Sequence, residues 1–219
     1  MSSKERDFVC ANTAIRTPSL VPEIKLYLAS EVTPLWHATE ATLERSQLPP
    51  PYWAFAWPGG QALARHLLDH PALIIGKRVL DIGAGSGLVS IAAKRAGAAH
   101  VTAAEIDAFA IAAIRLNAAL NAVDIEAESR DLIGAESRWD TILVGDMCYE
   151  RPLAERLTGW LHQLAARGAT VLLGDPGRAY LPKDGLREVA RYTVPTSLDL
   201  EDRTLRETLI WQLGGAIAI

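Results

Sequence analysis

Three closely spaced glycines follow an apolar stretch in the string VLDIGAGSGL. They are Gly83, Gly85 and Gly87, and an acid, Asp81, precedes the first of them by two positions. Because glycine has no Cβ, such a loop can turn tightly and bring its backbone close to a ligand at the start of a helix. The third position after Gly85 is Leu88, so the spacing differs from the Gly-x-Gly-x-x-Gly of dinucleotide-binding loops. The motif predicts a ligand-binding loop, and a turn that serves only sheet–helix packing is the alternative.

The Gly-x-Gly-x-Gly spacing led by Asp81 resembles the first motif of S-adenosylmethionine-dependent methyltransferases with a Rossmann-like core. The resemblance implies S-adenosyl-L-methionine as cofactor and S-adenosyl-L-homocysteine as product, with this loop as part of the cofactor site. Glu105 ends the next apolar run, and a carboxylate there can accept hydrogen bonds from both ribose hydroxyls. The same acid would suit the ribose of NAD, so Glu105 alone does not separate the two cofactors.

Two further stretches are candidates for the cofactor site. Asp131 resembles the acid that accepts from the adenine amino group in this class of enzyme, with Leu132 beside the ring, and a solvated loop aspartate is the alternative. Trp53, Phe55 and Trp57 would share one side of an extended segment. A sulfonium cation is attracted to an aromatic face, so we expect Trp57 to contact the cofactor. The alternative, which can hold at the same time, is that the tryptophans fill the core beneath a loop.

Five strings lie in order over roughly residues 20–180: PEIKLYLA, PYWAFAWPGGQALAR, VLDIGAGSG, GDMCYE and GDPGR. Together they resemble the ordered motifs of one family, the electron transfer flavoprotein beta-subunit lysine methyltransferases, within the seven-β-strand lysine methyltransferases. The resemblance implies methyl transfer from S-adenosylmethionine to lysine of the electron transfer flavoprotein beta subunit. The alternatives are another protein, such as a ribosomal protein, a small-molecule amine, or a non-catalytic cofactor-binding module that docks on a partner.

The string GDMCYE places an acid and a phenol where an apolar strand ends. Ligands of open parallel sheets bind at the carboxyl ends of the strands, so Asp146 and Tyr149 are the expected catalytic residues, with Gly145 at the cofactor. Burial would lower the pKa of a target lysine, whereas the Asp146 carboxylate would raise it. We therefore expect Asp146 to aim the amine and Tyr149 to pack on the lysine stem. The alternative is that Asp146 caps the following helix and Tyr149 only packs.

A second turn follows the next apolar strand, in the string GDPGR. Its Asp175 and Arg178 could contact the substrate or pair with each other.

Short apolar runs alternate with helical patterns from Lys77 onward, which is typical of βα units on a parallel sheet. One such helix is expected to begin after Asp107 as its N-cap. The last two apolar runs, 190–200 and 204–214, have no helix between them and could form an antiparallel pair at the sheet edge. The expected fold class is α/β: a Rossmann-like seven-stranded methyltransferase sheet, mostly parallel with an antiparallel C-terminal strand, and helices on both faces.

A single methyltransferase domain is expected over residues 1–219. Residues 1–60 are expected to form a lid or substrate-recognition segment, and residues 61–219 the Rossmann-like catalytic core. The string LPPPYWAFAWPGG within the first part is too rich in proline to predict an interior strand or helix.

Composition narrows the expected partners. The net charge of -4 gives no basic footprint for nucleic acid, and no apolar run is long enough to span a membrane. Cys10 and Cys148 form no Cys-x-x-Cys pair, and the histidines lack metal-binding spacing, so neither a disulfide framework nor a metal site is expected. Together with an N-terminus that lacks an apolar core, this favours a cytoplasmic protein. The protein substrate is what the family resemblance implies.

Overall fold

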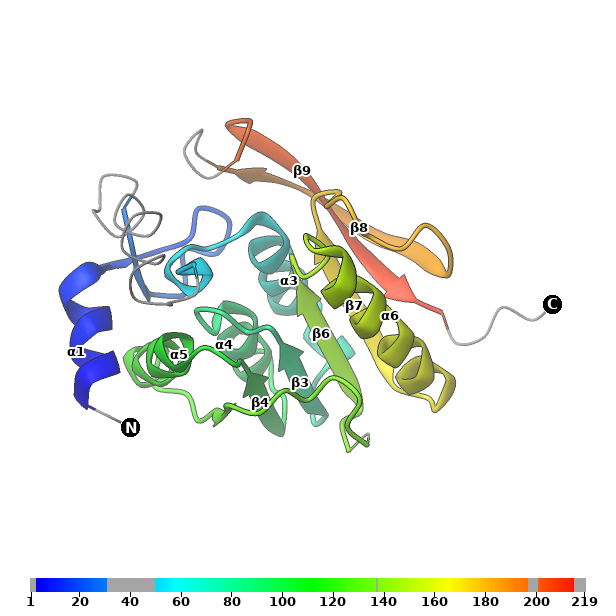
Figure 1. Ribbon diagram of the computed structural model, residues 1–219, viewed down its shortest axis with the longest axis horizontal. Helices are drawn as coiled ribbons and strands as arrows, with labels where there is room; N and C mark the ends of the chain where they lie inside the picture. The colour runs from blue at the N-terminus through cyan, green and yellow to red at the C-terminus, as the bar shows by residue number, and fades with distance from the viewer. Residues whose placement is uncertain (1–2, 31–49, 137, 197–200, 215–219) are drawn as a thin grey trace.

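A seven-stranded sheet forms the centre of the molecule in the computed structural model, which describes residues 3–30, 50–136, 138–196 and 201–214 (Figure 1). The spatial order of its strands is β5-β4-β3-β6-β7-β9-β8. The strands are β3 (Arg78–Ile82), β4 (His100–Ala104), β5 (Glu126–Glu128), β6 (Thr141–Gly145), β7 (Thr170–Asp175), β8 (Leu186–Pro195) and β9 (Leu205–Leu213).

The first five strands of the sheet run parallel, and β9 pairs antiparallel with both β7 and β8. This arrangement confirms the predicted fold class. The chain builds outward from β3 through β4 to β5, and then returns to the other side of β3 with β6 and β7. The order therefore reverses beside β3, and the carboxyl ends of the parallel strands meet at one edge of the sheet, where open α/β sheets bind their ligands.

Helices cover both faces of the sheet, as predicted. Leu80 and Ile82 of β3 pack in the core with α6, whereas Val79 packs on the opposite face with α3 and α4. The α5 residue Ile114 packs with Ala103 of β4. Near-continuous apolar strands buried on both faces explain why these runs form a parallel interior. The helices are α3 (Pro58–Asp69), α4 (Leu88–Arg95), α5 (Ala108–Leu120) and α6 (Arg151–Ala166).

The predicted start of α5 is confirmed, because the Asp107 carboxylate accepts a hydrogen bond of 2.8 Å from the Phe109 N–H. The N-terminal segment lies against this helix. Helix α1 (Ser3–Asn12) sits beside α5 (Figure 1), and the Phe8 and Phe109 rings are 4.7 Å apart between centroids. A short antiparallel pair follows, β1 (Ala14–Arg16) with β2 (Leu26–Leu28). Residues 31–49 of the segment lie outside the described part.

The proline-rich string contains structure that its composition did not predict. Residues Tyr52–Ala54 form a single 3-10 turn, and Pro58 begins helix α3. The expectation that this string holds no helix is therefore wrong at its end. Pro58 occupies the first helical position, where proline loses no hydrogen bond and its fixed φ suits the helix.

The first turn of α3 lies directly against the ends of β6 and β7. A Cβ on Gly59 would stand 2.1 Å from the Gly174 carbonyl oxygen, and a Cβ on Gly145 would stand 3.1 Å from the Gly60 Cα. Only glycines allow the helix to approach the two strands so closely. The Gly-Gly pair therefore fixes how α3 sits above the carboxyl ends of the sheet.

Replacing Gly59 with alanine is expected to destabilise the protein by about 1–3 kcal/mol, because backbone atoms must move to accept the methyl group. Gly60→Ala is the matched control. Its added Cβ would meet only Val89 Cγ2 at 3.9 Å, and alanine favours a helix over glycine. Urea unfolding of both variants measures the difference. Equal stabilities for the two variants would contradict the proposed close packing.

Candidate active site

A cavity of about 660 Å³ opens at the carboxyl ends of the parallel strands, a volume in the usual range for small-molecule sites. Most of the residues expected at a site line it. These are Trp57, Gly83, Gly85, Glu105, Asp131, Leu132, Gly145, Asp146 and Tyr149. Asp81 and Gly87, which were expected at the cofactor, are not among the lining residues.

The glycine loop joins β3 to α4 in a left-handed backbone conformation. The φ values of Gly83, Gly85 and Gly87 are 68°, 52° and 80°. A Cβ on Gly83 would stand 2.1 Å from the Met147 Sδ, so a side chain here would require Met147 to move. Gly87 is the N-cap of α4 and packs near Ile114 rather than at the cavity.

Asp81 lies beneath the loop rather than in the cavity. It is 1% exposed, and its Oδ2 accepts a hydrogen bond of 2.6 Å from the Ser90 hydroxyl of α4. Burial raises the pKa of Asp81 to about 7. The side chain thus ties the end of β3 to the helix that follows the loop, which places it one layer behind the cavity wall.

Glu105 connects the glycine loop with the end of β4. One carboxylate oxygen accepts from the Gly85 N–H at 3.2 Å, and the other accepts from the Ile106 N–H at 2.7 Å. Burial raises the pKa of Glu105 above its usual value, and the backbone N–H groups oppose this effect. The side chain lines the cavity while it braces both of its neighbouring loops.

Asp131 is paired as well as positioned at the cavity. Its Oδ1 accepts from the Ile133 N–H at 3.0 Å, and its Oδ2 lies 2.7 Å from Arg156 Nη2 of α6. The Asp131 side chain is 42% exposed, so it is a solvent-accessible loop aspartate that also borders the cavity. Leu132 beside it is buried and supplies an apolar part of the wall.

The aromatic segment is not extended throughout, because Tyr52–Ala54 form a 3-10 turn, and beyond it the Phe55 and Trp57 ring centroids lie 6.1 Å apart. Trp53 and Phe55 are 3% and 4% exposed and pack with the alanines of α5. Trp53 also lines the cavity, so it fills the core beneath the loop and borders the cavity at the same time. Trp57 lines the cavity, and its Nε1 donates to the Tyr52 carbonyl oxygen at 2.8 Å.

Asp146 follows β6 in a left-handed conformation with φ 56°, which is rare outside glycine. Its Oδ2 accepts from the Gly60 N–H at 2.9 Å, and its Oδ1 accepts from Arg178 Nη2 at 2.8 Å. The carboxylate therefore caps a helix, but the helix is α3 from earlier in the chain, not the following helix α6. Burial raises the pKa of Asp146 to about 6, and Arg178 opposes this increase.

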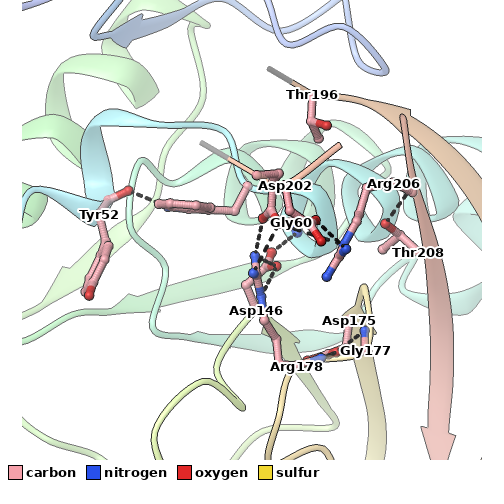
Figure 2. A network of polar contacts seen from close by, with 12 residues as sticks. Tyr52, Gly60, Asp146, Asp175, Gly177, Arg178, Thr196, Asp202, Arg206 and Thr208 are labelled. Atoms are coloured by element: carbon pink, nitrogen blue, oxygen red, sulfur yellow. Dashed lines mark hydrogen bonds and ion pairs between the residues drawn. The ribbon is translucent and has the colours of Figure 1, made fainter. Parts of the chain in front are cut away.

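The GDPGR turn supplies the cation for Asp146. The Arg178 guanidinium also contacts Glu201 in the segment between β8 and β9, with Nη2 at 2.6 Å from Oε1. Asp175 accepts instead from the backbone N–H groups of Gly177 and Arg178, each at 2.7 Å (Figure 2). The expected pairing of Asp175 with Arg178 is therefore a hydrogen bond to the Arg178 backbone N–H. The Arg178 side chain bonds to Asp146 and Glu201 instead.

Tyr149 stands at the mouth of the cavity. It is 42% exposed, and its ring centroid lies 5.5 Å from that of Tyr52, which is 43% exposed. Burial of its inner part raises the Tyr149 pKa above its usual value. The two phenol rings give the opening an aromatic rim with polar tips.

Comparison with known proteins identifies the family. Over 215 residues the chain is 40% identical to the electron transfer flavoprotein beta subunit lysine methyltransferase of Danio rerio, with 94% of this chain and 82% of the relative covered. The chain belongs to the electron transfer flavoprotein beta subunit lysine methyltransferase family. The Homo sapiens member is 38% identical over 215 residues, covering 93% of this chain and 80% of the relative.

Two broader similarities agree with this membership of the lysine methyltransferase family. The family model for ribosomal protein L11 methyltransferase (PrmA) matches residues 66–145. The fold is similar to magnesium protoporphyrin IX methyltransferase from Synechocystis PCC 6803 with bound SAM, with a TM-score of 0.54, 20% identity, and 72% of this chain and 80% of that chain covered. Membership of the lysine methyltransferase family confirms the predicted enzyme class, a methyltransferase.

Sequence reasoning missed several residues in and around the cavity. It assigned no role to Tyr52, which lines the cavity, to Gly60, which donates to Asp146, or to Glu201, which pairs with Arg178. Nothing in their spacing points to the cavity, because each comes from a segment distant from Asp146 in the sequence. The described residues contain no helix long and apolar enough to cross a membrane, and no group of three or more metal-ligating side chains.

Proposed function

We propose that this chain transfers methyl groups from S-adenosyl-L-methionine to lysine side chains of the electron transfer flavoprotein beta subunit. The observation that supports this most strongly is the shared cavity: the glycine loop, Glu105 and the Asp146–Tyr149 turn all line it. The relatives that cover most of the chain carry this substrate in their names.

The cavity suits such a cofactor in shape and chemistry. Gly83 and Gly85 leave backbone exposed along one wall, Leu132 and Trp53 provide apolar surface, and Glu105 supplies a carboxylate for two ribose hydroxyls. Asp131 would accept from the adenine amino group, and Gly145 and Trp57 would border the reactive end. Asp81 and Gly87 would not contact the cofactor directly, but they would hold the glycine loop in the conformation that binds it. When bound, the cofactor supplies an electrophilic methyl group whose bond to sulfur breaks as the amine nitrogen attacks, leaving the electron pair on sulfur.

The protein must present a neutral amine to that methyl group. A lysine with a pKa near 10.4 costs about 4.6 kcal/mol to deprotonate at pH 7. The aromatic mouth lowers this cost by removing water from the amine, and Tyr149 would pack on the lysine stem. Asp146 would accept a hydrogen bond from the amine and aim its lone pair, while the proton leaves to solvent. Alignment of this kind contributes up to about 7–11 kcal/mol in well-oriented reactions.

We propose that residues 1–60 recognise the protein substrate and cover the cofactor, beside a catalytic core of residues 61–219. Tyr52, Trp53 and Trp57 of the first segment line the cavity, which supports this division. A cytoplasmic setting remains part of the proposal because Cys10 and Cys148 are both free thiols.

Incubation of purified enzyme with flavoprotein and methyl-labelled cofactor is expected to label the beta subunit at lysine. Mass spectrometry of its peptides locates the methyl groups, and cell extract serves as a competing pool of substrates. Label on a different protein band would move the proposal to that protein, and label confined to small solutes would point to a small amine. Cofactor binding without any labelled product would identify a docking module instead of an enzyme.

A further inference from the structure

The Arg178 side chain lies between two carboxylates that come from distant parts of the chain. Its Nη2 is 2.8 Å from Asp146 Oδ1 and 2.6 Å from Glu201 Oε1, and its Nε is 3.3 Å from Asp146 Oδ1. The side chain is 18% exposed, and those of Asp146 and Glu201 are 10% and 5% exposed. A planar guanidinium can hold both partners at once, which a lysine ammonium does less well.

Arg178 is also part of the cavity itself. Its guanidinium carbon lies 5.7 Å from the centroid of the Trp57 ring, and the residue lines the cavity together with Asp146. The cation therefore stands beside the carboxylate that we expect to meet the acceptor amine. It is a fixed charge at the site and not a distant surface arginine.

The hairpin formed by β8 and β9 fixes the far side of Arg178. Arg206 of β9 places its Nε 3.7 Å from Glu201 Oε2 and its Nη1 2.7 Å from Asp202 Oδ1 (Figure 2). Glu201 is thus bracketed by two arginines. Through Glu201, the edge of the sheet controls where the Arg178 guanidinium can lie.

The remaining charged and titratable groups near Asp146 leave Arg178 as its close cation. Asp175 at the end of β7 repels the Asp146 charge, and its Oδ2 is buried without a hydrogen-bond partner. Cys148 is buried, and its pKa is raised to about 12 by burial and by the two aspartates, so it stays neutral. Helix α3 contributes the Gly60 N–H, which favours the ionised carboxylate.

A carboxylate at Asp146 has two opposite effects on an acceptor lysine. It can hold the amine in place, but it also stabilises the unreactive ammonium form. A cation next to the carboxylate weakens the second effect and keeps the first, because the hydrogen-bonding oxygen remains while the net charge felt by the amine falls.

We propose that Arg178 is a positioning residue for methyl transfer: it fixes the Asp146 carboxylate and offsets its charge, so that Asp146 can aim the acceptor amine without holding it as an ammonium ion. This inference rests on the proposed function. The charge of Arg178 sets the pH dependence of methyl transfer. Its planar guanidinium, which can donate two hydrogen bonds side by side, sets the orientation of Asp146.

The pH dependence of kcat separates these roles, because kcat reports the groups that titrate in the enzyme–substrate complex. Arg178→Met is expected to move the acidic limb of the kcat profile upward by about 1–3 pH units. Arg178→Lys keeps the positive charge and loses the planar guanidinium. It is expected to keep the limb near its wild-type position and to lower kcat on the plateau. A matched control is Arg191→Met, which removes an exposed arginine that pairs with Glu188 and Glu207 away from the cavity.

A second measurement needs no substrate. Carbon-13 NMR of the side-chain carboxyls, with the Asp146 signal assigned from Asp146→Asn, follows the titration of Asp146 directly. In Arg178→Met the Asp146 pKa is expected to rise by about 1–3 units, with no such change in Arg191→Met. If Arg178→Met does not fold, the double variant Arg178→Met/Glu201→Gln removes the unpaired Glu201 charge and carries the same expectation. Thermal unfolding reports whether each variant is folded.

The two proposals can fail separately. If wild-type enzyme does not label the beta subunit, the proposed substrate is wrong, and the NMR titration still decides the role of Arg178. If Arg178→Met lowers kcat by the same factor at every pH and leaves the Asp146 titration in place, Arg178 is only structural and the inference is overturned.

Discussion

Replacing Asp146 with alanine is expected to lower kcat by at least about 100-fold while the cofactor product S-adenosylhomocysteine still binds. The acceptor amine loses the oxygen that aims it, and a misplacement of about 1 Å can cost a factor of this size. The variant also removes the cap on the Gly60 N–H, a change that costs about 1 kcal/mol in comparable caps. Steady-state kinetics, calorimetry with S-adenosylhomocysteine and urea unfolding measure the three effects.

Two matched variants separate chemistry from stability. Asp146→Asn keeps an oxygen that can accept from Gly60 but has no charge, so we expect turnover to fall while most of the stability remains. Asp140→Ala removes an acid at the other end of the same strand, where its carboxylate pairs with Arg78 at 2.9 Å outside the cavity. It is expected to turn over like wild type. Should Asp146→Ala change stability alone, Asp146 would be a structural cap with no role in methyl transfer.

The parallel core was predictable because its signal is local. Strands such as Arg78–Ile82 and Thr141–Gly145 are apolar on both faces, and Asp107 is a typical helix cap at the start of α5. The glycine spacing likewise records a backbone requirement, since all three positions have positive φ. A conformation that is set by a residue's own backbone, or by the strand to which it belongs, can be predicted without knowing what packs against that residue.

Helix α3 was harder to predict, because the string before it is rich in proline and two glycines, which weaken a helix, follow Pro58 in its first turn. Gly59 and Gly60 lie close to the distant Gly174 and Gly145, and that contact exists only in the folded sheet. Composition therefore predicted a break where tertiary packing selected a helix. The same close approach brings the Gly60 N–H to Asp146.

The partners of Asp146 were hidden for a related reason. Arg178 follows the adjacent strand β7, so its position near the end of β6 could be anticipated. The direction of its long side chain could not, because that direction depends on the groups with which it pairs. It meets Asp146 on one side and Glu201 on the other, and Glu201 comes from the hairpin segment between β8 and β9. A sequence motif identifies which acid is at the strand end; it does not identify the cation that sets the strength of that acid.

Replacing Glu105 with alanine is expected to weaken cofactor binding by about 100-fold or more. Each hydrogen bond to a charged group contributes about 1.5–3 kcal/mol, and the proposed contact with the ribose contains two of them. The variant also releases the Gly85 and Ile106 N–H groups that the carboxylate now holds, so the glycine loop loses its brace. Calorimetry with S-adenosylhomocysteine measures the dissociation constant.

Two further variants, Glu105→Gln and Glu126→Ala, test whether the loss of affinity is specific to the Glu105 carboxylate. The side-chain amide that Glu105→Gln introduces can still accept from backbone N–H groups, so that variant is expected to keep the loop and to lose part of the ribose interaction, giving an intermediate affinity. Glu126 belongs to the neighbouring strand β5, where it pairs with His100 outside the cavity, and its removal is expected to leave affinity unchanged. Because Glu105 lies at the end of β4 and Asp146 at the end of β6, the two series test opposite sides of β3. An unchanged dissociation constant in Glu105→Ala would place the ribose elsewhere and remove the main reason for assigning this cavity to the cofactor.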